Sequence, residues 1–307
     1  MLAFTARRLA TAIPTLWIIA TLAFGLLHAA PGGPFDGEKE LLPEIRRSIE
    51  SAYHLDESVP QQYLRYLGQL ARGDLGPSFT YRDIGVNELI RQGLPIDLAI
   101  GGLALLVALL VGLPLGALAA VKRGTVWDRA ALGIALLGIS IPTYVIAPVL
   151  VLVFAVALKW LPAGDWGDGN WRHLVLPVLA LSAPYSAIIA RLFRASLVEV
   201  LEAPYIRTAR AKGLSWATIL VRHASRPALL PIVSYLGPTA VGVITGSIVI
   251  ETVFGLPGIG RFFVNGAFNR DYTIVMGVTL LYGVLIVIAN LLADLCYAWL
   301  DPRVRLR

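Results

Sequence analysis

The sequence predicts an all-α integral membrane protein with six transmembrane helices, and three observations support this prediction. Hydrophobic residues make up 57% of the chain and charged residues 15%, whereas soluble domains contain about 45–50% and about 25%. The apolar residues gather in runs of about 20, the length that crosses the hydrocarbon core of a bilayer. Lys and Arg residues gather in the connections on one side of these runs. Together these observations exclude a soluble globular domain.

Six apolar runs follow one another along the chain. They cover residues 9–30, 97–121, 130–158, 174–193, 228–250 and 273–300. The first follows Arg7 and Arg8 like a secretory signal, but its apolar region is too long for one and further spans follow it. We therefore expect a retained first helix and, with six spans, both termini on the same side of the membrane.

The distribution of charge predicts which side that is. With cytosolic termini, the cytosolic segments contain most basic residues and few acidic ones. These basic residues are Arg7, Arg8, Lys122, Arg123, Arg129, Arg191, Arg194, Arg207, Arg210, Lys212, Arg222, Arg226, Arg303, Arg305 and Arg307. The positive-inside rule therefore predicts a cytosolic N-terminus before the first helix (residues 1–30) and a cytosolic C-terminus (301–307). The net charge of +6 then follows from topology and does not indicate a nucleic-acid partner.

Residues 31–95 separate the first span from the other five, which form a core over residues 96–300. Acidic residues outnumber basic ones in this segment, which fits an exposed subdomain on the outer side. Two stretches, 43–53 and 60–71, begin with proline and carry apolar residues at helical spacing, so we expect two short amphipathic helices. The subdomain is either a docking or gating surface for a soluble partner or a cap over the outer ends of the helices.

Small and ionisable residues inside the spans predict packing rather than ion coupling. Gly112 with Gly116, and Gly242 with Gly246, lie one turn apart and allow helices to approach closely. Ionisable residues at membrane depth, which mark ion-coupled transporters, are scarce. Asp294 is expected to pair with an interfacial arginine or with Asn290. The chain therefore has no evident ion-coupling machinery of its own.

Catalytic and metal-binding signatures are absent from the sequence. It has no Gly-x-Ser-x-Gly, no His-Glu-x-x-His and no Gly-x-x-x-x-Gly-Lys-Ser/Thr motif, and its four histidines fall in different segments. We therefore predict no catalytic residue, no metal site and no cofactor bound by this chain. If the chain takes part in uphill transport, another polypeptide must hydrolyse ATP.

The basic loop over residues 198–227 is the most informative segment. Residues 199–212 favour a helix, Gly213 is placed to end it in a left-handed conformation, and Ser215 can cap a second helix. That second helix is expected to run toward Arg222 and to end before Pro227. Two short helices with a bend would form a basic elbow suited to a groove on a cytosolic protein.

Motifs over nearly the whole chain resemble one protein family. They include residues 73–78 (Gly-Asp-Leu-Gly-Pro-Ser), 206–214 (Ile-Arg-Thr-Ala-Arg-Ala-Lys-Gly-Leu), 250–260 (Ile-Glu-Thr-Val-Phe-Gly-Leu-Pro-Gly-Ile-Gly), 269–272 (Asn-Arg-Asp-Tyr) and 300–303 (Leu-Asp-Pro-Arg). The chain resembles the B-type inner-membrane permease subunits of bacterial oligopeptide ATP-binding-cassette (ABC) importers. Of the family's Glu-Ala-Ala, three residues, Gly signature, Ala209 and Gly213 match, and Arg207 replaces the glutamate.

The resemblance implies the type I ABC importer permease fold in the bacterial inner membrane, and it implies partners. These are a homologous C-type permease subunit, two ABC ATPases that bind ATP and Mg, a periplasmic peptide-binding protein, and membrane lipid. The loop would contact the ATPases through Arg207, Ala209, Arg210, Lys212, Gly213 and Leu214. The outer turn would contribute Gly255, Pro257, Gly258 and Gly260 to a gate, or would simply be a tight re-entry turn.

The sequence leaves alternatives for the substrate and for the class of protein. Dipeptides, nickel chelates, glutathione or peptide-like antibiotics are alternatives to oligopeptides. An ion-coupled secondary transporter would need buried charges, and an intramembrane enzyme would need a nucleophile and a base; neither set is evident in the sequence. We therefore predict an importer permease, a subunit without an active site of its own.

Overall fold

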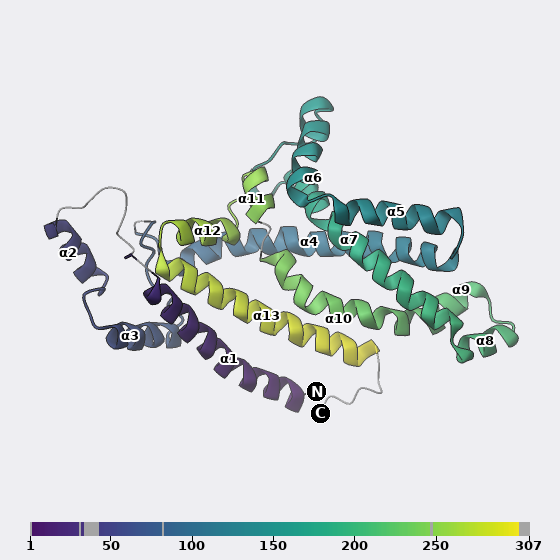
Figure 1. Ribbon diagram of the computed structural model, residues 1–307, viewed down its shortest axis with the longest axis horizontal. Helices are drawn as coiled ribbons and strands as arrows, with labels where there is room; N and C mark the ends of the chain where they lie inside the picture. Colours follow the sequence, from purple (N-terminus) through teal and green to yellow (C-terminus); the bar gives the residue numbers. More distant parts are fainter. Residues whose placement is uncertain (1, 31, 34–42, 82, 246–247, 301–307) are drawn as a thin grey trace. The chain divides into compact units, whose positions relative to one another are not determined.

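The computed structural model describes residues 2–30, 32–33, 43–81, 83–245 and 248–300, which form helices and one isolated bridge between Pro77 and Gly85 (Figure 1). The elements are α1 (Leu2–Ala29), α2 (Pro43–Ala52), α3 (Val59–Ala71), α4 (Val86–Val121), α5 (Val126–Ser140), α6 (Thr143–Leu150), π-helix η1 (Val151–Ala157), 3-10 helix η2 (Gly167–Gly169), α7 (Trp171–Glu202), α8 (Pro204–Ala211), α9 (Trp216–Thr218), π-helix η3 (Ile219–Ala224), α10 (Ser225–Ile244), α11 (Ile248–Phe254), α12 (Ile259–Phe268) and α13 (Tyr272–Leu300). The all-α prediction is confirmed, and the predicted C-terminal segment 301–307 lies outside the described residues.

Five helical stretches are long and apolar enough to cross a membrane. They are residues 6–29 of α1, all of α4, all of α7, the continuous stretch Trp216–Ile244, and residues 272–298 of α13. Two further pairs pass the same test but are bent, α5 with the α6–η1 stretch by 99° and α11 with α12 by 100°. The described residues thus hold five candidate spans and two bent pairs, and the number six stays a prediction.

The helices that contain the second and fourth predicted spans are longer than predicted, since α4 begins at Val86 and α7 runs to Glu202. Two other predicted spans are interrupted or end early. The third, predicted as continuous over 130–158, breaks after Ser140 because Ile141 precedes a proline and adopts an extended conformation with ψ 117°. The fifth, predicted to reach residue 250, ends at Ile244. In both regions the apolar run continues through the break, so hydropathy alone does not mark it.

The chain divides into two compact units, described separately here. Unit 1 comprises the described parts of 1–8, 96–256 and 285–307, and unit 2 those of 9–95 and 257–284. The predicted outer segment 31–95 thus belongs to a larger unit that also takes in most of α1, α12 and the first part of α13. This grouping depends on contacts between segments far apart in the sequence, and the order of apolar and polar residues along the chain does not predict such contacts.

In unit 1, α4 packs closely on α7 through two glycines. A Cβ atom at Gly116 would lie 2.5 Å from the carbonyl oxygen of Ala190, and one at Gly112 would lie 2.7 Å from that of Ser186. Both obstacles are backbone atoms, which cannot move aside like a flexible side chain. The close approach predicted for this glycine pair is confirmed.

Replacing Gly116 by alanine is expected to destabilise the protein by about 1–3 kcal/mol, because the added methyl overlaps backbone. Gly133 in α5 is the matched control, since a Cβ there meets nothing within 4 Å. Gly133→Ala should be neutral or stabilising by up to about 1 kcal/mol. The thermal midpoint of the detergent-purified chain measures both changes, and equal losses would contradict the packing argument.

Two other expectations for the spans have opposite outcomes. The close approach predicted at Gly242 is wrong, because a Cβ at this position would meet nothing within 4 Å; Gly246 lies outside the described residues. The expected partner of Asp294 is confirmed, because Arg8 Nη2 lies 2.5 Å from its Oδ2. This pair joins the first turns of α1 to the last turns of α13.

In unit 2, the two predicted amphipathic helices are confirmed as α2 and α3. α3 is held against α1 by side-chain hydrogen bonds: His28 Nε2 lies 3.0 Å from Gln62 Oε1, and the hydroxyls of Thr21 and Tyr63 lie 2.6 Å apart. α3 is therefore fixed to a membrane-spanning helix rather than attached only by its loops.

A fully buried carboxylate fixes the segment that leads from α3 to α4. Asp271, directly before α13, has no exposed surface. Its Oδ2 accepts hydrogen bonds at 2.7–2.9 Å from the Ser78 hydroxyl and the Phe79 and Thr80 amides, and its Oδ1 accepts from the Ile274 amide at 3.1 Å. The Thr273 hydroxyl lies 2.8 Å from Oδ1 and 2.6 Å from the Pro77 carbonyl oxygen, and its single proton serves one of the two. One carboxylate thus both caps α13 and holds the 78–80 turn.

Candidate functional site

The basic loop folds into two short helical arms joined by a turn. α7 ends at Glu202 because Ala203 is extended (ψ 146°) ahead of Pro204, and Pro204 occupies the first turn of α8. The predicted single helix over 199–212 is therefore divided at Ala203. We call residues 203–218 the elbow, and in Figure 1 its helices α8 and α9 lie together beyond the ends of α7 and α10.

Gly213 makes the bend of the elbow. Its φ is +76°, in the left-handed region that the sequence predicted for it. Around it, the Gly213 amide donates to the Arg210 carbonyl at 2.9 Å and the Leu214 amide donates to the Ala209 carbonyl at 3.3 Å. These two bonds satisfy carbonyl groups that the end of α8 would otherwise leave without partners.

The second arm begins as predicted and continues further than predicted. The Ser215 hydroxyl oxygen accepts from the Thr218 amide at 3.3 Å, which confirms the predicted cap. The expectation that Pro227 ends this helix is wrong, because η3 continues directly into α10 and Pro227 lies in the first turn of α10. The wider π-helical turn of η3 precedes the proline, and proline is tolerated in a first turn.

Buried apolar side chains anchor the elbow to the membrane helices. Ile206 and Ala209 of α8 pack in one hydrophobic cluster with Leu197 of α7, Ile219 of η3 and Ala228 of α10. Motion of α8 must therefore displace α7 and α10 as well, because close-packed side chains transmit displacement. Ala209, expected on the contact surface, lies on this anchoring face with Ile206, which was not among the predicted residues. The i, i+3 spacing of Ile206 and Ala209 is the sequence signal for this face.

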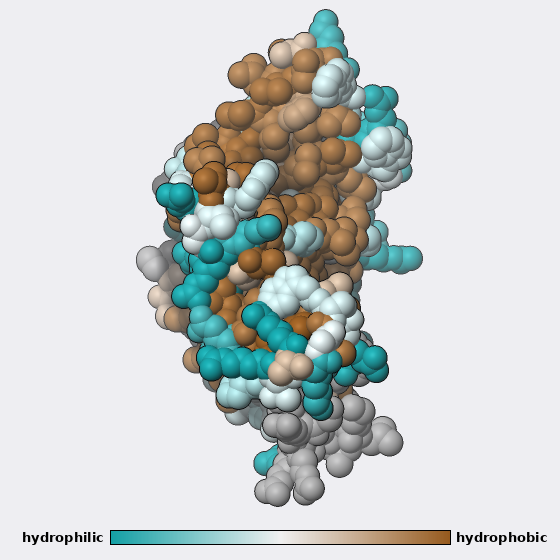
Figure 2. Space-filling model, turned by 90° about the vertical axis from the view of Figure 1, so that its right-hand side faces the viewer, coloured by the Kyte–Doolittle hydropathy of each residue, from teal (hydrophilic) through white to brown (hydrophobic). Residues whose placement is uncertain are grey.

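The opposite face of the elbow is exposed and basic. Residues 211–217 are all exposed, as are Arg207 and Arg210. The Arg210 guanidinium lies 4.3 Å from the centre of the Trp216 ring, a cation–π contact that braces the two arms. In the described part of the chain, no carboxylate forms an ion pair with Arg207, Arg210 or Lys212. Figure 2 looks at this end of the helices and shows a band of polar residues beside a broad hydrophobic surface.

Of the predicted contact residues, the structure brings five to the exposed side of the elbow. They are Arg207, Arg210, Lys212, Gly213 and Leu214. Ala209 is buried instead, 6% exposed, and supports the bend from within. Trp216, which was not among the predicted contact residues, is also exposed on the elbow.

The outer turn predicted as a gate is a tight bend between α11 and α12. Gly255 has φ +66°, and Gly258 is the residue that precedes the first turn of α12. Gly260 is buried in α12. The turn passes from one compact unit to the other at Leu256–Pro257, and these residues are not part of the elbow.

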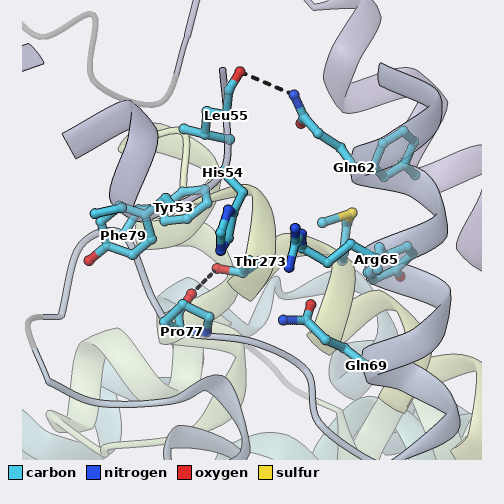
Figure 3. Close-up of a pocket in the computed structure, with 13 residues that line it drawn as sticks. Tyr53, His54, Leu55, Gln62, Arg65, Gln69, Pro77, Phe79 and Thr273 are labelled. Atoms are coloured by element: carbon cyan, nitrogen blue, oxygen red, sulfur yellow. Dashed lines mark hydrogen bonds between the residues drawn. The ribbon is translucent and has the colours of Figure 1, made fainter. Parts of the chain in front are cut away.

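A small cavity of about 130 Å³ lies within unit 2 (Figure 3). Arg65 and His54 point toward it, and the rings of Tyr53 and Phe79 lie on one side of it. Arg65 also holds Glu57 through bonds of 2.5 and 3.2 Å, which lowers the pKa of that carboxyl. In the described ranges, no three His, Cys, Asp or Glu side chains come together as metal ligands.

Comparison with known proteins identifies the family. Residues 112–306 match the family described as the binding-protein-dependent transport system inner membrane component, and residues 1–97 match its N-terminal counterpart. The chain belongs to this family. It is therefore a multi-pass membrane protein of the transport class, as the sequence predicted.

Curated relatives in the family match over almost their full length. The oligopeptide transport system permease protein OppB of Salmonella typhimurium is 50% identical over 305 residues, 99% of this chain and 100% of the relative. OppB of Haemophilus influenzae is 48% identical with the same coverage. The dipeptide transport system permease protein DppB of Bacillus subtilis is 43% identical over 95% of this chain and 94% of the relative.

Solved structures support the fold. The inward-facing MetNI methionine ABC transporter matches with a TM-score of 0.58 and 20% identity, over 69% of this chain and 96% of that chain. An amino acid ABC transporter with histidines matches with a TM-score of 0.53 and 18% identity, over 69% and 94%. The predicted type I ABC importer permease fold is confirmed.

Proposed function

We propose that this chain is a permease subunit of an ATP-driven importer and forms, with a homologous C-type subunit, a path for oligopeptides across the bacterial inner membrane. The observation that carries the proposal is the elbow: an exposed, basic structure anchored in α7 and α10. The relatives named as oligopeptide permeases are 48–50% identical to this chain. The ATP and Mg would be bound by two partner ATPases, which dock on the elbow.

The proposed function requires one orientation of the chain in the membrane. The termini and the elbow would face the cytosol, while residues 31–95 and the 254–260 turn would face a periplasmic peptide-binding protein. Binding of ATP would close the ATPases and move the elbow. The anchored helices would then close the transport path on one side of the membrane and open it on the other. A ligand shifts such an equilibrium only through its different affinities for the two states.

The experiment is reconstitution of the chain with the C-type subunit, both ATPases and the binding protein in proteoliposomes. We expect uptake of labelled oligopeptides that requires ATP and every partner. Uptake driven by an ion gradient without the ATPases would overturn the proposal. Labelled dipeptides, nickel chelates and glutathione test the other substrates in the same vesicles, since the dipeptide permease relative is 43% identical.

Arg210→Glu should lower peptide uptake by roughly tenfold in this assay, because it reverses an exposed charge on the docking face and removes the stack on Trp216. Arg210→Lys is the matched control, because it keeps the charge, and it should retain most of the uptake. Co-purification with the ATPases locates the defect. If the Arg210→Glu variant assembled with the ATPases and took up peptide like the wild type, Arg210 would not be part of the contact.

A further inference from the structure

A partly buried ion pair, whose carboxylate is buried, joins the first turn of α5 to α7 near the elbow. Arg194 donates to both oxygens of Asp128, from Nε to Oδ1 at 2.6 Å and from Nη2 to Oδ2 at 2.8 Å. The amide of Gly124 donates to the same Oδ2 at 2.9 Å. Asp128 is only 4% exposed. A two-point contact between planar groups fixes direction as well as distance, so α7 holds the α4–α5 connection in one orientation.

A second pair repeats this link closer to the elbow. Arg123, on the same connection, pairs with Glu202, the last residue of α7 before the break at Ala203. Both side chains are more than half exposed, so this pair contributes little by itself. It nevertheless joins the same two segments at the point where the elbow begins.

Apolar packing places the end of α4 beside the elbow as well. Ala120, in the last turn of α4, belongs to the hydrophobic cluster that contains Ile206 and Ala209 of α8. Arg194 lies roughly 12 Å along α7 from Glu202. The connection between α4 and α5 is thus bound to α7 at two places, at Arg194 and at Glu202.

We propose that Asp128 and Arg194 are positioning residues that carry movement of the elbow into α4 and α5, in addition to α7 and α10. A buried ion pair is poor evidence for a contribution to stability, because apolar residues of the same size often stabilise as well. What the Asp128–Arg194 pair supplies is a fixed direction between two helices. The inference rests on the proposed function, because the elbow moves only if a partner drives it.

Arg194→Lys tests whether the two-point geometry of the pair matters beyond its charge. Lysine keeps the positive charge but cannot form two parallel hydrogen bonds to the carboxylate as the planar guanidinium does. In the reconstituted complex, the measurement is peptide taken up per ATP hydrolysed. We expect Arg194→Lys and Asp128→Asn to assemble with the ATPases and to lower this ratio by roughly fivefold to tenfold. Arg191→Lys is the matched control on the exposed side of α7 and should keep the wild-type ratio.

A distance measurement tests the link without relying on transport. Nitroxide labels replace Arg129 on α5 and Thr208 on α8, both exposed, in a Cys296→Ser background because Cys296 is the single cysteine and is exposed. With the Asp128–Arg194 pair intact, we expect one narrow distance that ATP leaves unchanged. In Asp128→Asn, we expect the distribution to broaden or shift when ATP is added.

The outcomes are distinguishable. A wild-type uptake ratio in Arg194→Lys, or an unchanged distance distribution in Asp128→Asn, would overturn the positioning role. A lower thermal midpoint with an unchanged ratio would show a purely structural pair and would also overturn it. Absence of ATP-dependent uptake in the wild-type complex would instead refute the proposed function.

Discussion

Gly213→Pro is expected to abolish ATP-driven uptake, with a fall of roughly 100-fold, while the chain still inserts in the membrane. Proline fixes φ near about −65° and so cannot adopt the +76° of Gly213. It also removes the amide that donates to the Arg210 carbonyl. The bend between the arms must then open, and the exposed basic face loses its shape. Peptide uptake in proteoliposomes measures the loss, and membrane fractionation checks insertion.

Gly213→Asn is the matched control for this change. Asparagine visits the left-handed region more readily than other residues that have a side chain. A Cβ at Gly213 meets nothing within 4 Å, so the side chain has room. We expect uptake close to that of the wild type. If asparagine were as damaging as proline, the absence of a side chain, rather than the backbone conformation, would be what the site requires.

Asp271→Asn is expected to lower the stability of the protein by at least about 3 kcal/mol, because buried hydrogen bonds to a charged group are lost together. Oδ2 accepts from three donors, the Ser78 hydroxyl and the Phe79 and Thr80 amides, and Oδ1 accepts from the Ile274 amide. The asparagine amide must place its NH₂ against one of these sets, and a flip of the amide only exchanges one set for the other. The thermal midpoint of the purified chain should fall by roughly 5–10 °C.

Asp74→Asn provides the comparison on a nearby segment. Asp74 is exposed, and its Oδ1 accepts from the Gly76 amide at 2.9 Å. Asparagine keeps that oxygen, so we expect a change within about 0.5 kcal/mol. Equal changes in the thermal midpoint for Asp271→Asn and Asp74→Asn would mean that the buried hydrogen bonds of Asp271 do not stabilise the protein more than the exposed one of Asp74.

The class of the fold and the shape of the elbow were predictable because they depend on local chemistry. Apolar run lengths predicted the spans, Gly213 predicted the left-handed bend, and Ser215 predicted the cap of the second arm. Each of these signals acts within a few residues. The single helix expected over 199–212 was wrong because Pro204 disfavours a helical conformation at Ala203, which is extended.

The remaining features depend on residues far apart in the sequence. Asp271 bonds to the 78–80 turn, and Arg194 bonds to Asp128; neither spacing forms a recognisable pattern. The bend in the third span and the end of the fifth at Ile244 lie inside apolar runs, so hydropathy does not reveal them. The buried role of Ala209 becomes visible only when Ile206 is seen on the same face.

The two faces of the elbow consist of different residues, and this has an evolutionary consequence. Ile206 and Ala209 hold the elbow to its helices, whereas Arg207, Arg210 and Lys212 project from it. Substitutions on the projecting face leave the anchoring contacts intact, so the charge pattern can drift while folding is preserved. Under the proposed function, duplicated copies of such a gene could therefore acquire new ATPase partners through a few surface changes.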